Sequence, residues 1–451
     1  MKARWLLAVC LLAVAAGVAA NFAGRGSGAA QGQAGTSPSV PSAQARAAPR
    51  EHTAAEPAQA LQAPPEQPSG KPDVAADLAA RLVAGDADAV RAAAADLRRR
   101  LRTDPAAWEA AAALLLDPAT PETLREALAM VLGTIDSPRT DPLLLDALAR
   151  FGRTPGFARA ALLAIGATRE PPGGDPSVDD FFGFGDRPWG LKGPGGIGIT
   201  VRRDIADDAT RSAVGAYLGS DMLDARRAAA TAMRHSLDHA DALASFVDVL
   251  SRESADPVAA VVGESLAARA RATADGSERD ALLAAVFARA GEPDFEGYRF
   301  RMEDDLARVP VPAAQRAVLT GLAAPERPFA MRAFALQVLT STAVASGEAA
   351  VGDTRELLTR TLSADGDDAA RDAAARLLRS LPADGAALAA LSKASGSDTA
   401  WNVRFTALEA YAHLASAEAA RAALDAASHD PDERVRGRAR ELASELESRP
   451  R

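Results

Sequence analysis

The chain has 451 residues, a formal net charge of −9, 48% hydrophobic residues, 4% aromatic residues and one cysteine. An acidic protein repels phosphate backbones, so the charge argues against nucleic-acid binding. The single cysteine, Cys10, excludes an intramolecular disulfide, and the core must be built from aliphatic side chains.

The first twenty residues have the pattern of a secretory signal peptide. Lys2 and Arg4 precede an uncharged run from Trp5 to Ala20 that ends in small residues. The run has 16 residues, close to the shortest that crosses a bilayer, so a retained signal anchor is the alternative to cleavage after Ala20. We therefore expect a periplasmic or secreted protein, or an inner-membrane-anchored protein that faces the periplasm and contacts the membrane only through this segment.

Residues 21–75 are rich in Ala, Gly, Ser, Gln and Pro. Such a segment has too few hydrophobic residues to repay the entropy of ordering. We predict a disordered linker at 21–75 that leads to a folded domain at 76–451.

Within the folded domain a two-residue mark recurs, an apolar residue followed by Arg in an alanine-rich helix. The first three copies end 34 residues apart, at Arg91, Arg125 and Arg159. Further copies end at Arg226, Arg332, Arg371, Arg404 and Arg436. A period of this length predicts an all-α solenoid of about nine to ten helical hairpins. Two units are irregular, with Ala260-Val261 in place of the mark and with Tyr298-Arg299 displaced along the chain.

Apolar residues at helical spacing indicate the individual helices, and the marked helix is taken as the first of each hairpin. The predicted pairs begin with 85–101 and 105–116, 121–135 and 140–152, and 155–166 and 207–219, and six more follow to residue 428. A last helix at 431–447 has no partner in this scheme, and its polar outer face suits a terminal cap.

Several helix starts show Thr or Asp directly before Pro. These residues are Thr120, Thr154, Asp256 and Asp430 before marked helices, and Asp104 and Asp141 before second helices. We expect their side-chain oxygens to accept hydrogen bonds from the free backbone N–H groups at the helix start. Pro suits the first helical position, because it lacks the N–H that would have no partner within the helix.

The repeats resemble HEAT repeats and the related HEAT-like repeats first associated with phycobilin lyases. The pattern Asp-x-x-Val-Arg-x-x-Ala occurs at Asp432, Val435, Arg436 and Ala439, with looser copies around Arg404 and Arg371. In that family, Asp and Arg residues of successive repeats form a ladder, and the second helices line a concave surface that binds partners. The resemblance implies a structural role for the marked Arg residues and leaves the function open. Lyase activity is not implied, because those enzymes are cytoplasmic whereas this chain carries an export signal.

One long insert, residues 167–206, replaces a short turn between two helices. It holds four aromatic residues among Gly and Asp, and a β-prone run at 197–201 that favours a short strand or hairpin. The four are Phe181, Phe182, Phe184 and Trp189. A loop of this length is usually functional or disordered, and these rings are candidates for partner contact. The alternative is that they fold back onto the concave groove, since large exposed apolar patches are rare.

No residue pattern indicates catalysis. His235 and His239 flank a turn without a third ligand, so no metal site is predicted, and no cofactor motif has its required context. We therefore expect a non-enzymatic exported scaffold that binds a protein or peptide through its concave face and the insert. The alternatives are a signal-anchored solenoid that assembles an envelope complex, and an enzyme or ligand carrier that uses the insert and the groove.

Overall fold

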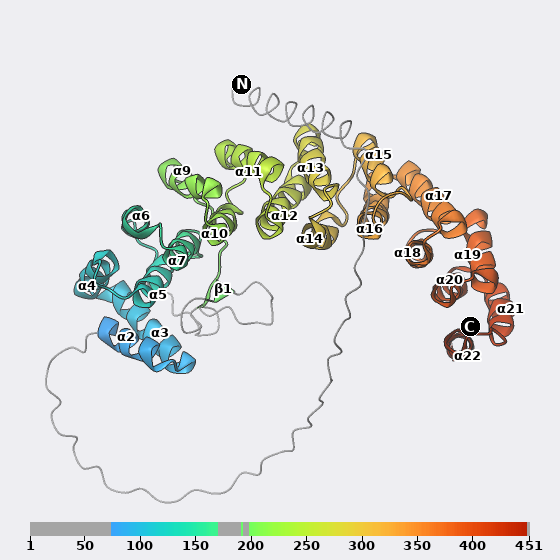
Figure 1. The fold of residues 1–451 in the computed structure, drawn as a ribbon, viewed down its shortest axis with the longest axis horizontal. Coiled ribbons are helices and arrows are strands. Elements are labelled where there is room, and N and C mark those ends of the chain that lie inside the picture. Colours follow the sequence, from blue (N-terminus) through green and yellow to red (C-terminus); the bar gives the residue numbers. More distant parts are fainter. Residues whose placement is uncertain (1–73, 170–190, 193–197, 449–451) are drawn as a thin grey trace, which may run out of the picture.

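The structure is a computed structural model that describes residues 74–169, 191–192 and 198–448. Its helices form two layers that curve into an open arc (Figure 1). The inner layer contains α3 (Ala87–Thr103), α5 (Glu122–Gly133), α7 (Pro155–Ile165), α10 (Leu223–Met233), α12 (Asp256–Ala272), α14 (Glu296–Leu306), α16 (Phe329–Ser346), α18 (Asp368–Leu378), α20 (Trp401–Leu414) and α22 (Glu433–Ser448). The outer layer contains α4 (Pro105–Leu116), α6 (Thr140–Phe151), α9 (Asp208–Ala216) with the 3-10 turn η2 (Tyr217–Gly219), α11 (Ala240–Arg252), α13 (Gly276–Ala290), α15 (Ala313–Leu322), α17 (Glu348–Ala364), α19 (Gly385–Ser397) and α21 (Ala417–Ala427).

The predicted α-solenoid is confirmed, with ten helical pairs among the described residues when α2 (Val74–Ala84) is counted as the partner of α3. Every expected helix is present, and its ends lie within four residues of the expected ones. One helix, α2 (Val74–Ala84), was not expected, and it includes two residues of the predicted linker. Leu78 and Leu82 lie one turn apart on α2 and pack on the core, so this helix covers the open end of the first repeats.

The predicted order of helices within each pair is wrong. The marked helices line the concave side of the arc, whereas the helices predicted to do so form the outer layer (Figure 1). The marked helix is therefore the second of its pair, and α22 is the inner partner of α21. The error has a physical cause: several helices pack on both the preceding and the following one, as α12 does on α11 and α13, so spacing alone does not identify the layers.

The predicted N-caps are confirmed only in part. Asp104 caps α4, because its carboxylate accepts from the backbone N–H of Ala106 at 3.0 Å. Thr154 stands at the cap position of α7 without a side-chain hydrogen bond, and Pro121 replaces Thr120 as the cap of α5. Of the remaining three carboxylates, Asp430 accepts from the backbone N–H of Asp432 at 2.8 Å, and it also pairs with Arg404 as described below. Asp141 binds two Arg residues of the insert, also described below. The third, Asp256, accepts from the backbone N–H of Tyr298 on α14 at 2.7 Å.

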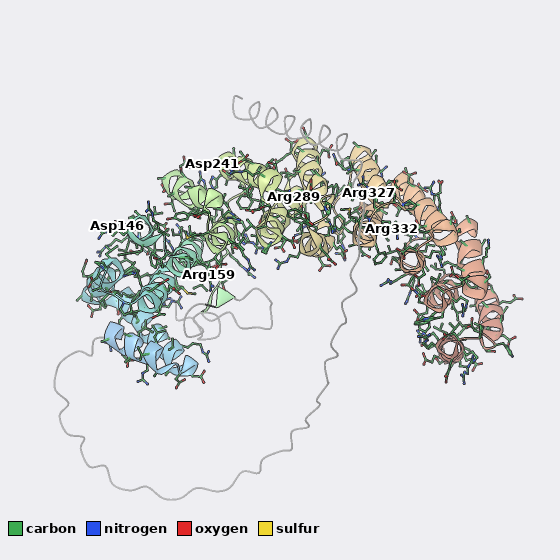
Figure 2. The ribbon with its side chains drawn as sticks, viewed as in Figure 1. Asp146, Arg159, Asp241, Arg289, Arg327 and Arg332 are labelled. Atoms are coloured by element: carbon green, nitrogen blue, oxygen red, sulfur yellow. The ribbon has the colours of Figure 1, made fainter. Side chains whose placement is uncertain are left out.

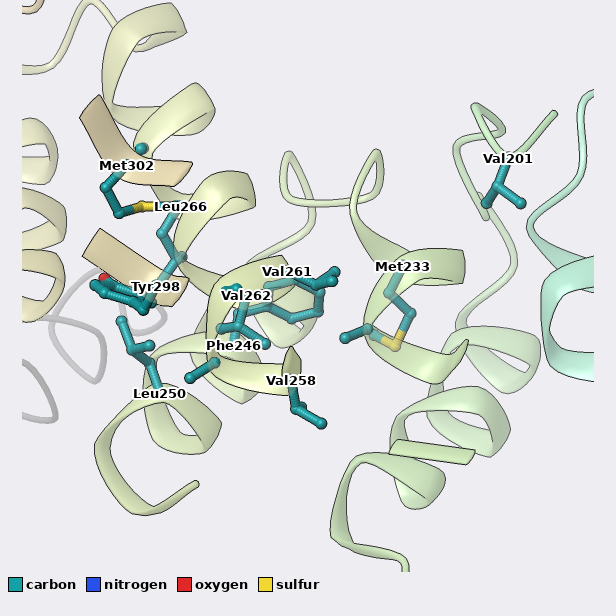
Figure 3. Packing of buried hydrophobic residues seen from close by; sticks show 14 of the residues in the cluster. Val201, Met233, Phe246, Leu250, Val258, Val261, Val262, Leu266, Tyr298 and Met302 are labelled. Atoms are coloured by element: carbon teal, nitrogen blue, oxygen red, sulfur yellow. The ribbon is translucent and has the colours of Figure 1, made fainter. Parts of the chain in front are cut away.

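The core runs continuously along the arc between the layers. Figure 3 shows Phe246 of α11, Val262 of α12 and Met302 of α14 packed in one cluster. Tyr298 is completely buried there, and its hydroxyl donates to the carbonyl oxygen of Val286 at 3.0 Å. Burial of Tyr298 raises its pKa, so the phenol stays neutral. The irregular repeat is therefore filled by one large ring.

Small residues bring the inner helices close together near the N-terminal end. A Cβ atom placed on Gly133 would lie 2.5 Å from the carbonyl oxygen of Ala164 on α7. One placed on Gly166 would lie 2.6 Å from the Cα atom of Ala232 on α10. No side chain fits at such distances, so glycine permits both approaches.

Candidate partner-binding site

The insert leaves and rejoins the solenoid through a hydrogen-bonded neck. After α7, Ala167 forms an antiparallel bridge with Val201, and the backbone N–H of Thr168 donates to the carbonyl oxygen of Thr200 at 2.7 Å. Further out, β1 (Leu191–Lys192) pairs antiparallel with β2 (Gly198–Ile199), with Leu191 opposite Ile199. The β-prone run thus contains a short strand, as the sequence predicts.

The neck is also packed against the solenoid. Ile199, Val201 and Ile205 are buried in the main core. The backbone N–H of Ile205 donates to the hydroxyl of Ser236, just after α10, at 2.9 Å. These contacts hold the neck on the end of α10 by hydrophobic burial and by a buried hydrogen bond.

One carboxylate binds both ends of the insert. Asp141, in the first turn of α6, accepts from Arg203 at 2.6 and 2.9 Å and pairs with Arg169. Arg203 also donates to the carbonyl oxygen of Ile165 at 2.9 Å. Burial acts to raise the pKa of Asp141, but hydrogen bonds from Arg203 and Arg169 outweigh it, and the pKa lies below its ordinary value. Asp141 is therefore an ionised clamp, not the helix cap that the sequence suggests.

The neck lies on the concave side of the arc. Figure 1 shows β1 on the inner side of α7 and α10, and Figure 2 shows Arg159 on the same side of α7. Phe181, Phe182, Phe184 and Trp189 lie outside the described residues, so their contact with a partner stays a prediction. The structure nevertheless fixes where the insert starts and returns.

Three marked Arg residues form ion pairs that join successive repeats toward the C-terminus. The pairs are Arg332 with Asp365, Arg371 with Asp398, and Arg404 with Asp430. In the last two, both guanidinium and carboxylate bond twice, at 2.8 to 2.9 Å. The Arg332 and Asp365 side chains are only 3% and 5% exposed, so this pair is shielded from water.

Each Asp of these pairs also meets the next marked Arg through its backbone. The carbonyl oxygens of Asp365, Asp398 and Asp430 accept from Arg371, Arg404 and Arg436 at 2.8, 2.8 and 2.7 Å. One Asp therefore binds two consecutive Arg residues, the first with its carboxylate and the second with its main chain. Such contacts form a continuous ladder from Arg332 to Arg436.

The marked Arg residues of the N-terminal half have different contacts. Arg226 pairs with Glu253 at 2.8 Å, which replaces the Asp of the ladder, while Arg91 pairs locally with Asp88. Arg125 donates to the carbonyl oxygen of Thr120 at 2.8 Å and lies 3.9 Å from the centre of the Phe151 ring. Burial and the nearby charge of Glu122 raise the pKa of Glu126. The positive charge of Arg159 acts in the opposite direction but does not outweigh them.

Two further Arg residues have similar roles without matching the mark. The displaced Arg299 of α14 is 4% exposed and donates to the carbonyl oxygens of Glu292 and Ala290 at 2.7 and 3.2 Å. Arg211 of the outer helix α9 donates to those of Ile205 and Ala206 at 2.8 and 2.7 Å. Both are Arg residues near the start of a helix, where the guanidinium reaches backbone carbonyl oxygens of the preceding segment.

The described part of the chain holds no group of three or more His, Cys, Asp or Glu side chains arranged for a metal ion. His239 lies 3.1 Å from Asp204, and His235 is exposed beside the neck. None of the described helices combines the length and the apolar character needed to cross a bilayer.

Residues 354–443 match the family model described as HEAT repeats, which lies within the ladder region. No curated protein sequence matches the chain.

Three solved structures share a similar path at low identity. Human deoxyhypusine hydroxylase is 17% identical with a TM-score of 0.28, over 76% of this chain and 96% of that one. A Kap121p mutant is 13% identical with a TM-score of 0.42, over 83% and 45%. The C-terminal fragment of the Chaetomium thermophilum cohesin loader SCC2 is 15% identical with a TM-score of 0.28, over 84% and 36%. This chain therefore spans less than half of the last two.

Proposed function

Because this chain is a HEAT-repeat protein, we propose that it is a non-enzymatic scaffold that binds a protein or peptide partner along its concave face. The observation that carries the proposal is the clamped neck, which brings a long insert to the inner side of the helical layer. A solenoid framework stacks repeats to form an extended surface and leaves recognition to the residues on it.

The inner face differs from repeat to repeat, which suits one specific partner. On α16 its half-exposed residues include Ala333 and Gln337, which lie one turn apart. On α18 the corresponding positions are Asp372 and Arg376, which form an ion pair at 3.1 Å. A neutral stretch on α16 is thus followed by a charged one on α18, so a partner would be recognised by its own sequence of side chains.

The insert is proposed to add a second contact. Phe181, Phe182, Phe184 and Trp189 would supply aromatic anchors, which commonly dominate binding energy at interfaces. The support is indirect: Asp141 holds the flanking residues Arg169 and Arg203, so the insert starts and returns at one fixed point of the solenoid. Replacing the four aromatic residues by Ser should weaken partner binding without unfolding the solenoid.

Export is proposed from the N-terminal twenty residues. In this proposal the protein acts in the periplasm or outside the cell, with the segment 21–75 as a spacer. A retained segment would instead anchor the solenoid to the inner membrane facing the periplasm. N-terminal sequencing of the mature protein decides between them, since a start at Asn21 excludes the anchor, and a cytoplasmic location of the intact chain would refute export.

Site-specific photo-crosslinking in cells tests the concave face. A photoreactive amino acid at Ala333 or Gln337 should crosslink a discrete partner, and the same group at the exposed Glu356 of outer helix α17 should not. Equal crosslinking from both layers, or none from the inner positions, would overturn the proposal. A partner that crosslinks equally well without the four insert aromatics would remove the insert from the binding site and leave the concave face.

A further inference from the structure

Three Arg side chains gather on the concave side at the insert neck without an ion pair. Arg227 and Arg234 belong to α10 and its C-terminal end, and Arg202 belongs to the neck. None of the three forms an ion pair within 4.0 Å in the part of the chain that the structure describes, whereas the neighbouring Arg211 and Arg226 do. We call these residues the basic patch.

The geometry of α10 places Arg227 and Arg234 on the concave side. This helix packs on α7 and α12 within the inner layer and on α9 in the outer layer, so its fourth side faces the concave side, where the neck lies on its C-terminal end. Arg227 and Arg234 are seven residues apart, which is two helical turns, and both are half-exposed along the same line. Their separation along the helix axis is about 10 Å.

Arg202 and His235 extend the patch toward the neck. Arg202 is exposed and directly precedes Arg203, whose guanidinium is held by Asp141. Burial lowers the pKa of His235, and the nearby charges of Arg234 and Arg202 lower it further. His235 therefore lies within the positive field of both Arg residues.

Two carboxylates of neighbouring inner helices, Glu264 and Asp305, lie within electrostatic range of Arg234. Glu264 of α12 is 7% exposed and accepts from Arg301 of α14 at 3.2 Å. Asp305, next to Asp304 on α14, lies beside Arg271, which donates to its carbonyl oxygen at 3.3 Å. These groups reach Arg234 only through longer-range electrostatics. The basic patch thus keeps an excess of positive charge on a protein whose net charge is −9.

We propose that the basic patch binds an acidic, extended segment of the partner protein. This inference rests on the proposed scaffold function and specifies the chemistry of its ligand. Guanidinium groups bind carboxylates with two parallel hydrogen bonds, and an unpaired Arg is available for them. Carboxylates three residues apart on a chain in the extended polyproline-II conformation lie on one side about 9 Å apart and reach both Arg227 and Arg234. Leu223, one turn before Arg227 and 43% exposed, provides an apolar contact at one end.

A binding assay with a defined probe tests the patch. The probe is a fluorescein-labelled peptide of one leucine followed by four Glu-Gly-Ser repeats, measured by fluorescence anisotropy on the full-length protein. Arg227→Glu combined with Arg234→Glu should weaken its binding by about tenfold or more. Arg360→Glu combined with Arg421→Glu, at exposed outer-layer positions, changes the net charge equally and should alter affinity less than about twofold.

Several results would overturn the proposal. One is an equal loss of peptide affinity in both double variants, and another is no peptide binding at low salt. A third is tighter binding of a single-stranded DNA of equal length, which would make the patch a nucleic-acid site. Binding that appears only after Glu170, Asp175, Asp179, Asp180 and Asp186 are changed to their amides would assign the patch to the chain's own insert. As a positive readout, bound peptide should raise the pKa of His235 measured by NMR, because carboxylates favour its charged form.

Failure of this inference is distinguishable from failure of the scaffold function. If the partner still crosslinks from Ala333 and Gln337 while the peptide does not bind, the concave face binds a partner that is not acidic at this point. If the peptide binds at the patch while no partner crosslinks from α16, the extended interface is wrong and the patch stands alone.

Discussion

Replacing Asp430 by Ala should break the ladder at its last complete rung. The carboxylate accepts from Nε and Nη2 of Arg404 at 2.8 and 2.9 Å, and the two residues are 9% and 8% exposed. Removing one partner of a buried ion pair costs about 3–5 kcal/mol, because the other charge stays desolvated. Arg404 keeps its hydrogen bond to the carbonyl oxygen of Asp398 at 2.8 Å. We therefore expect the lower end, a loss of about 3 kcal/mol in the local free energy of unfolding.

Hydrogen exchange measured by mass spectrometry is the appropriate assay, since a solenoid can open at one end without unfolding globally. Exchange should accelerate in α20, α21 and α22 and stay unchanged in α5 and α7. The control is Asp146→Ala on the convex side (Figure 2), whose pair with Arg150 is about half exposed and should contribute less than about 0.5 kcal/mol. A loss below about 1 kcal/mol for Asp430→Ala, or acceleration spread evenly along the chain, would refute the assignment of a shielded rung.

Three further outcomes are expected. Burial acts to raise the pKa of Asp430, but hydrogen bonds from Arg404 outweigh it and hold the pKa below its ordinary value. The stabilisation by this ion pair is therefore present above about pH 4 and is lost as the pH falls through the folded-state pKa. Urea titrations of Asp430→Ala and wild type should accordingly converge in acid. Asp141→Asn should speed tryptic cleavage within 170–197 by about fivefold, and unchanged cleavage would show that the clamp does not hold the neck. Gly166→Ala should destabilise by about 1–3 kcal/mol in thermal melts, whereas Gly352→Ala, which has open space around its Cβ position, should not, and equal effects would contradict the close approach.

Much of the fold follows from local patterns in the sequence. Helices were predictable because alanine-rich stretches with apolar residues three and four apart, such as Leu124 and Leu128, can bury one face. The order of layers was not predictable, because several helices, such as α16 between α15 and α17, pack on both neighbours in the chain and the apolar pattern does not distinguish the two. Helix α2 contains Ala80-Arg81, but this copy lies only ten residues before Arg91 and follows a Pro-rich segment, so the 34-residue period does not reveal the helix.

The site was predictable in position only. An interruption of the 34-residue period locates the insert, but neither Asp141 nor Arg203 stands out in the sequence, since they are 62 residues apart. Their pairing depends on the close contact of α6, α7 and the returning chain. The basic patch is equally hidden, because Arg202 joins Arg234 only through the folding of the neck onto α10.

The two-sided role of Asp365, Asp398 and Asp430 makes the C-terminal repeats interchangeable modules. Each module presents an Arg to the next carboxylate and a carbonyl oxygen to the next Arg, so a module copied or deleted between α16 and α22 leaves matching groups at the new junction. The α12 and α14 repeats do not share this property, since Val261 replaces the Arg and Tyr298 fills the space beside Gly263. The length of this arm, and with it the reach of the concave surface, can therefore change by whole repeats while the central segment and its insert stay constant.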